Sequence, residues 1–235
     1  MELVMNVSTR TLKGVSEVVG TVLTFAIVVG LISNAFLFGM PLLRKEMDKA
    51  RVVYHEKAMS ELADAIEATA REGGETRVKI EAKSGTPPTI KLVYDNTWGG
   101  YQIELRSSSK YTYYAPYDVP RNDDFGPFNE SGRTAGKLSL AAGTLGVNKG
   151  VVLTARSTKL SGGVRLVMKL IPRPLRDPAK GKLTLIRLSP ISGKSTRDTL
   201  PTTVVIKKLG ETTEQSMEGG VPVTYRIITV GVGFE

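Results

Sequence analysis

One long uncharged segment limits the folds that are open to this chain. No residue from 18 to 43 carries a charge. A helix of about 20 apolar residues crosses the hydrocarbon core of a bilayer, which is roughly 30 Å thick. The apolar region of a secretory signal peptide is shorter, and a buried helix of a soluble protein rarely stays apolar over such a length. The sequence therefore predicts a membrane-competent helix near the N-terminus.

The helix is expected to continue beyond this segment with a different pattern. Residues 44–72 contain no Gly or Pro and are rich in Ala, Glu, Lys, Met and Leu, which favour helix. Positions spaced by three or four residues form one stripe, namely Val52, His55, Met59, Leu62, Ile66 and Ala70. We expect one helix over residues 15–72, apolar in 15–43 and amphipathic in 44–72. Gly73 and Gly74 would end it, and Pro41 would kink it because proline removes a backbone hydrogen bond.

The remainder of the chain has the pattern of a β domain. Short alternating runs are separated by Gly, Pro, Ser and Asn. The predicted strands cover residues 76–82, 89–94, 101–105, 111–114, 151–156, 164–171, 182–188, 202–208 and 223–230. We predict an α+β fold, a long N-terminal helix followed by an antiparallel, immunoglobulin-like β-sandwich head over residues 73–235. These strands are expected to supply their own core, so a fragment that begins near Gly73 should fold alone.

Residue usage argues against most kinds of enzyme. The chain has no Cys, which excludes disulfides and thiolate metal sites, and its single His, His55, argues strongly against a His-based triad or a multi-His metal site. No Gly-rich phosphate loop, nucleophile elbow or HExxH motif occurs. The 32 Lys and Arg outnumber the 23 Asp and Glu, but they are dispersed and do not form a nucleic-acid-binding run. We therefore expect no catalytic site, no cofactor and no specific nucleic acid partner. His55 lies on the stripe and is expected to be a packed residue.

The middle of the head contains candidate surface features. A tyrosine cluster is either a subunit-contact or adhesive surface or ordinary strand content, and its members are Tyr111, Tyr113, Tyr114 and Tyr117. Asn129 begins an N-glycosylation sequon, and its glycosylation would require an extracellular head. Acidic residues gather nearby without the spacing of a calcium loop, and we interpret them as a solvated loop without a metal: Asp118, Asp123, Asp124 and Glu130.

The junction before the apolar helix resembles that of a known family. A short polar N-terminus ends at Lys13 and Gly14, and Val15 then opens the long apolar helix. The sequence KG-VSEVVGTVL resembles the class III signal peptide of archaeal type IV pilins and archaellins. The resemblance in residues covers about residues 1–60, and the head resembles the family in architecture alone.

The resemblance implies processing and assembly. A membrane-embedded prepilin peptidase would cut between Gly14 and Val15, with Lys13 as the basic recognition residue and residues 1–14 as the leader. The retained helix would form the core of a helical homopolymer, with an assembly ATPase and a membrane platform protein as further partners. Bacterial pilins carry an acid five residues after the junction, where it pairs with a neighbour's amino terminus. Val19 holds that place here, and Glu17 is the nearby acid.

Small residues of the apolar segment would allow parallel helices to approach closely. Gly20, Ala26 and Gly30 lie along it, and Pro41 lies near its end. Two functions remain open at this point. The first is a pilin of an archaeal adhesive filament, membrane-inserted as a precursor and extracellular when mature. The second is an uncleaved, membrane-anchored envelope protein whose head binds the surface layer, as archaellum accessory subunits do.

Overall fold

The structure is a computed structural model, and it describes residues 9–82, 87–96, 99–110, 143–218 and 221–235. The chain divides into two compact units, Met1–Met47 and Asp48–Glu235. The described part of the first unit is helical throughout. The second unit contains the rest of the same helix together with all of the described strands.

Helix α1 spans Thr9–Glu72, so it begins six residues before the predicted start at residue 15. The backbone stays helical on both sides of Pro41. The helix ends where predicted, because Gly73 and Gly74 adopt positive φ angles of 82° and 84°, which glycine tolerates without strain. The N–H of Gly73 donates to the carbonyl of Thr69 at 2.9 Å and closes the last turn.

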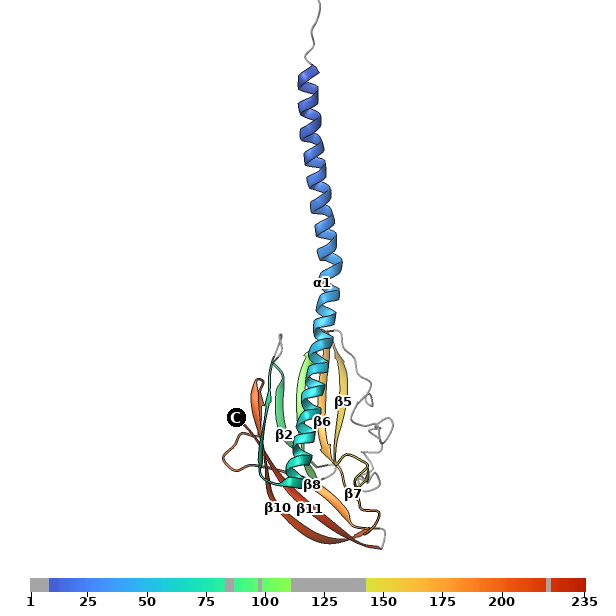
Figure 1. The fold of residues 1–235 in the computed structure, drawn as a ribbon, viewed down its shortest axis with the longest axis vertical. Helices are drawn as coiled ribbons and strands as arrows, with labels where there is room; N and C mark the ends of the chain where they lie inside the picture. Colours follow the sequence, from blue (N-terminus) through green and yellow to red (C-terminus); the bar gives the residue numbers. More distant parts are fainter. Residues whose placement is uncertain (1–8, 83–86, 97–98, 111–142, 219–220) are drawn as a thin grey trace, which may run out of the picture. The chain divides into compact units, whose positions relative to one another are not determined.

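The second unit is a β-sandwich of two sheets (Figure 1). The first sheet has the order β1 (Glu75–Ile80), β10 (Thr202–Glu218), β11 (Val221–Phe234), β8 (Leu183–Pro190), β7 (Leu175–Arg176) and β4 (Gly143–Thr144). The second sheet has the order β5 (Val151–Leu160), β6 (Gly163–Pro172), β3 (Gly100–Ser109), β2 (Thr89–Asp95) and β9 (Arg197–Thr199). The predicted helix followed by a β-sandwich is thus confirmed.

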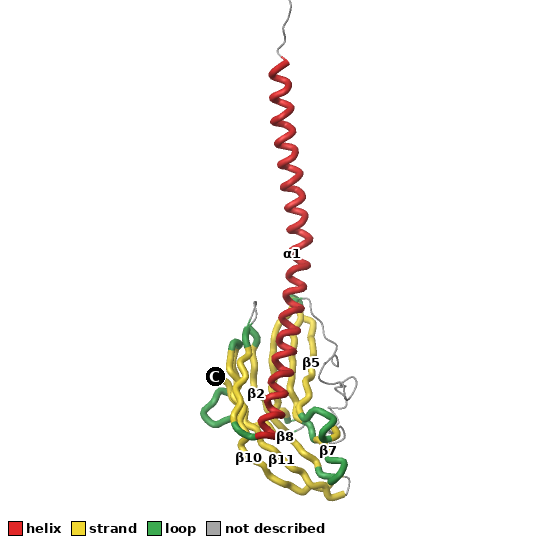
Figure 2. The backbone as a smooth tube through the Cα atoms, in the orientation of Figure 1, coloured by secondary structure: helices red, strands yellow, loops and turns green. Residues whose placement is uncertain are grey.

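Most neighbouring strands run antiparallel, with two exceptions. Strand β11 pairs in parallel with β8, where Tyr225 lies opposite Leu183, and β4 pairs in parallel with β7. The longest pairing is the β10–β11 hairpin, which has a bulge between Lys208 and Gly210. Figure 2 shows these two strands running beside β8 along the first sheet. The expected antiparallel sandwich thus holds for most strand pairs, and these two parallel pairs are additions to it.

The core of the head includes the amphipathic part of α1. One buried cluster joins helix side chains with side chains from both sheets. Met59, Leu62 and Ile66 are fully buried in it. The sequence placed the boundary of the head at residue 73, whereas the compact unit begins at Asp48. The expectation that the strands supply their own core differs from the structure, because the stripe of α1 fills part of it.

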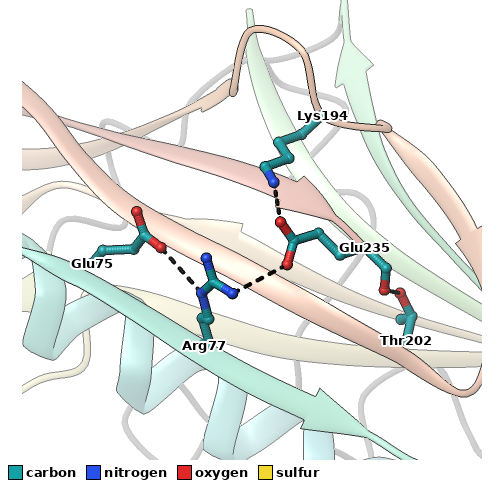
Figure 3. A network of polar contacts seen from close by, with 5 residues as sticks. All are labelled: Glu75, Arg77, Lys194, Thr202 and Glu235. Carbon is teal, nitrogen blue, oxygen red and sulfur yellow. Dashed lines mark hydrogen bonds and ion pairs between the residues drawn. The ribbon is translucent and has the colours of Figure 1, made fainter.

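Polar contacts tie the end of β11 to β10, to the edge strand β1 and to Lys194 (Figure 3). Glu235 forms ion pairs with Lys194 and with Arg77, the latter at 3.5 Å, and Arg77 also contacts Glu75 at 3.1 Å. The hydroxyl of Thr202 donates to the Glu235 carbonyl at 2.9 Å. The Lys194 ammonium lowers the pKa of the Glu235 carboxyl. Exposed ion pairs stabilise little, so we assign this network to fixing the register of β1, β10 and β11.

Candidate functional site

The candidate functional site is the apolar segment of α1, residues 18–43. Its large side chains are exposed, and the exposed fractions of Phe25, Leu37 and Phe38 are 70%, 69% and 78%. A helix that is apolar all round belongs in a bilayer or inside a bundle of helices. The segment is long and apolar enough to cross a membrane. Its chemistry is therefore that of a surface that requires lipid or other apolar helices around it.

Small residues leave room for a second helix along this segment. Apart from the neighbouring backbone of the helix itself, no atom of the described residues lies within 4 Å of the position that a Cβ would take at Gly20, Gly30 or Gly39. A shallow hollow at the first of these glycines is lined by Gly20, Thr21, Thr24, Phe25 and Val28. The hydroxyl of Thr24 donates to the carbonyl of Gly20 at 2.9 Å, so this polar group is satisfied within the helix. Ala26 is exposed in the same region.

The predicted processing residues lie inside α1. The backbone is helical at Lys13, Gly14 and Val15, because the helix already begins at Thr9. The side chains of residues 9–17, including that of Glu17, lie outside the described part of the structure. A peptidase would have to unwind the helix at Gly14, and glycine is about 1 kcal/mol less favourable in a helix than alanine. Gly14 is thus a position at which local unwinding costs little.

Several predicted surface residues lie outside the described residues. These are the tyrosines Tyr111, Tyr113, Tyr114 and Tyr117, the sequon residue Asn129, and the acidic residues Asp118, Asp123, Asp124 and Glu130. The strand predicted over residues 111–114 lies outside them as well. Among the residues that are described, no group of three or more His, Asp or Glu side chains could hold a metal ion.

A polar clamp at the start of the head was not predicted. The carboxylate of Asp48 accepts hydrogen bonds from the backbone N–H of Lys110 at 2.7 Å and from the hydroxyl of Ser109. Arg51 pairs with Asp48 and donates to the carbonyl of Ser108. We call these contacts of Asp48 and Arg51 with residues 108–110 the Asp48 clamp. An Asp and an Arg three residues apart on a helix give only a weak signal in sequence, because the strand end that they contact is distant.

His55 is a packed residue, as predicted. Its side chain is completely buried, and neither ring nitrogen has a hydrogen-bond partner among the described residues. The ring meets that of Tyr54 edge-on at a centroid distance of 5.9 Å. Burial first, and the nearby Arg51 guanidinium second, lower the pKa of His55 from 6.5 to about 4. The imidazole is therefore neutral at physiological pH.

The head also contains a cavity of about 410 Å³ beside the end of α1. Three of its charged lining groups, Glu67, Lys149 and Arg173, have protein partners. Glu67 accepts a hydrogen bond from the N–H of Val151 at 3.0 Å, and Lys149 pairs with Asp64 at 3.4 Å. Arg173 donates from Nε to the carbonyl of Lys149. We assign these groups to joining α1 to the loop before β5.

Comparison with known proteins gives one similarity. A model for a family of unknown function (DUF7289) matches residues 13–86. The match begins at Lys13 and ends beyond β1, so it covers the larger part of α1 and the first strand but less than half of the chain. No curated protein and no solved structure matches the chain.

Proposed function

We propose that the protein is the structural subunit, or pilin, of an archaeal type IV pilus-like extracellular filament that serves adhesion or surface attachment. The observation that carries the proposal is the exposed, uncharged segment 18–43 of a helix whose continuation is built into the core of a head. Because α1 is part of the core of the head, insertion of its apolar part anchors the head at the same place.

The apolar segment suits both the membrane-inserted precursor and the assembled filament. Lipid would surround its side chains in the precursor, and parallel copies of the helix would surround them in the filament. Because both surroundings are apolar, leaving the bilayer for the bundle costs little net free energy. The open positions at Gly20, Gly30 and Gly39 favour close packing in the bundle.

The predicted junction at Gly14 and Val15 completes the proposal. A prepilin peptidase would remove residues 1–14, and an assembly ATPase and a platform protein would extrude the subunits. These partners come from the resemblance of the junction to archaeal type IV pilins. The family match that begins at Lys13 supports a shared segment that starts near this junction.

The decisive experiment is N-terminal sequencing of the native protein together with a Gly14→Val variant. We expect a native chain that begins at Val15, and filaments in the sheared surface fraction under the electron microscope. The Gly14→Val variant should accumulate as uncleaved precursor without filaments, because a branched side chain blocks the scissile position. Ala50→Val is the matched control, since it adds the same kind of branched side chain at an exposed position of α1 outside the apolar segment. A Gly14→Val chain that still begins at Val15 would refute the assignment.

A second candidate is the uncleaved, membrane-anchored envelope protein whose head binds the surface layer. One observation favours it, namely that α1 begins at Thr9 and is already helical at Gly14. A native chain that begins at Met1, with no filaments in the sheared fraction, would support this candidate in place of the pilin.

A further inference from the structure

We propose that the end of the head that contains the Asp48 clamp is a basic surface that binds the anionic headgroups of a lipid bilayer. The inference needs only that residues 18–43 insert into a membrane. It therefore rests on a premise that both candidate functions share and does not depend on filament formation.

Three strands and the start of the helical part of the head meet at this end. Strand register places Ser108 opposite Arg165 and Lys159 opposite Val164, so β3 and β5 end where β6 begins. The Asp48 clamp joins α1 to the end of β3. The turn after β5 is held close to β3, because a Cβ at Gly163 would lie 2.7 Å from the carbonyl oxygen of Ser109. The φ angle of 154° at Gly163 also requires glycine.

With Glu46 as an exposed acid just before Asp48, the described residues at this end carry four exposed positive charges. The side chains that carry them are Lys49, Lys110, Lys159 and Arg165. The negative charge of Asp48 does not offset them, because it is balanced by the Arg51 guanidinium in an ion pair. Leu160 stands at the tip of the β5–β6 hairpin with 45% of its side chain exposed. Cationic side chains around an exposed apolar one are suited to an anionic membrane interface.

The short length of chain between the apolar segment and the head indicates that lipid headgroups are the partner of the basic end. Only residues 44–47 separate residue 43 from Asp48. These residues are helical in α1, where the five steps from residue 43 to residue 48 rise only about 7.5 Å. The headgroup region adds roughly 5–7 Å on each side of the hydrocarbon core, and charges act over a Debye length of about 8 Å at physiological salt. The basic end of the head is therefore held within range of the headgroups whenever residues 18–43 are inserted.

The test measures lysine accessibility in the membrane-inserted protein. The full chain is reconstituted into vesicles of phosphatidylcholine alone or of phosphatidylcholine mixed with phosphatidylglycerol. Lysines are acetylated with a water-soluble reagent, and the rates are read by mass spectrometry. We expect Lys110 and Lys159 to react at least about threefold more slowly in the anionic vesicles, with the difference lost at high salt. Lys180 and Lys182, which are exposed in the loop before β8, should react at the same rate in both.

A matched pair of variants separates this surface from a general effect of charge. Lys159→Glu combined with Arg165→Glu should return Lys110 to the rate seen in neutral vesicles. Lys180→Glu combined with Lys182→Glu should leave the slow reaction of Lys110 unchanged. Equal reaction of Lys110 in both kinds of vesicle would overturn the inference, as would release of the protein from membranes by alkaline carbonate. A native chain that begins at Met1 would refute the pilin but leave these expected results in place.

Discussion

Asp48 and Lys110 are joined by a hydrogen bond of 2.7 Å, from the backbone N–H of Lys110 to a carboxylate oxygen of Asp48. The two residues are far apart in sequence, one on α1 and one at the end of β3. Ser109 and Arg51 contact the same carboxylate. A single side chain thus fixes the point at which the helix becomes part of the head.

Asp48→Ala should destabilise the head. The substitution removes an ionised acceptor and leaves partly buried donors on Ser109 and Arg51 without it, which costs about 1–3 kcal/mol. Thermal unfolding of the full chain in detergent, followed by circular dichroism of the β signal, measures the effect. Glu46→Ala is the control, because Glu46 is exposed in the preceding turn. Identical melting of the two variants would show that the clamp does not stabilise the head.

The stripe of α1 should be essential for the core of the head. Leu62→Ala removes a fully buried side chain and should cost about 2–5 kcal/mol. Val53→Ala changes a side chain that is 52% exposed on the same helix and should stay within about 0.5 kcal/mol of the parent. Urea titration of both variants tests the difference. Equal midpoints would mean that the strands form a core without the helix.

A fragment of residues 73–235 should fail to fold, whereas one of residues 48–235 should fold. The first lacks Met59, Leu62 and Ile66, which are part of the buried cluster, and so exposes the sheet side chains that they cover. Size-exclusion chromatography and the dispersion of amide signals in NMR spectra compare the two. A monomeric, well-dispersed 73–235 fragment would contradict the structure.

The stability of the head should fall as the pH is lowered from about 6.5 to about 4. His55 has a pKa near 4 in the folded protein and near 6.5 when unfolded, so the unfolded chain takes up the proton first. Above pH 6.5 both states are neutral and there is no effect. Below it the difference grows to about 3 kcal/mol and then levels off. Unfolding as a function of pH measures this step.

His55→Leu should remove this step from the pH profile, because leucine cannot take up a proton. Tyr54→Phe should retain it, since the neighbouring phenol does not titrate in this range. A step of unchanged size in His55→Leu would assign the pH dependence to other groups.

Ala26→Asp should permit insertion but block assembly. One aspartate near the centre of a transmembrane helix costs about 2.5–3.5 kcal/mol to insert, which a segment this apolar tolerates. In a filament each subunit would bury an unpaired carboxylate, at several kcal/mol apiece. Electron microscopy of sheared fractions should show filaments for Ala26→Ser, which stays small and uncharged, and none for Ala26→Asp. Normal filaments from the aspartate variant would exclude residue 26 from the filament core.

Local patterns in the sequence predicted most of the elements. Alternation of apolar and polar residues located β2, β5, β6 and β8 to within a few residues, because each has one face in the core. The spacing of Met59, Leu62 and Ile66 predicted the stripe of α1, and their burial confirms it. Uncharged composition alone predicted the apolar segment.

Long-range relationships could not be predicted in this way. The outer part of β10 was missed because residues 209–217 are exposed and show no apolar alternation. The parallel pairing of β11 with β8 depends on where distant strands meet. The Asp48 clamp was missed for the same reason, since the sequence near Asp48 does not indicate a contact with Ser109 or Lys110. The spacing of apolar residues predicted the stripe of α1, but it did not predict which sheet side chains pack against the stripe.

The continuity of α1 also has a mechanical meaning. If the protein forms the proposed filament, tension along its core would enter the head through α1, whose side chains are part of the core of the head. Met59, Leu62, Ile66 and the Asp48 clamp are then loaded in shear, so that many contacts must slip at once instead of opening one after another. A head attached through a flexible tether would be pulled away from its terminus first. The connection between α1 and the head should therefore resist mechanical unfolding under tension.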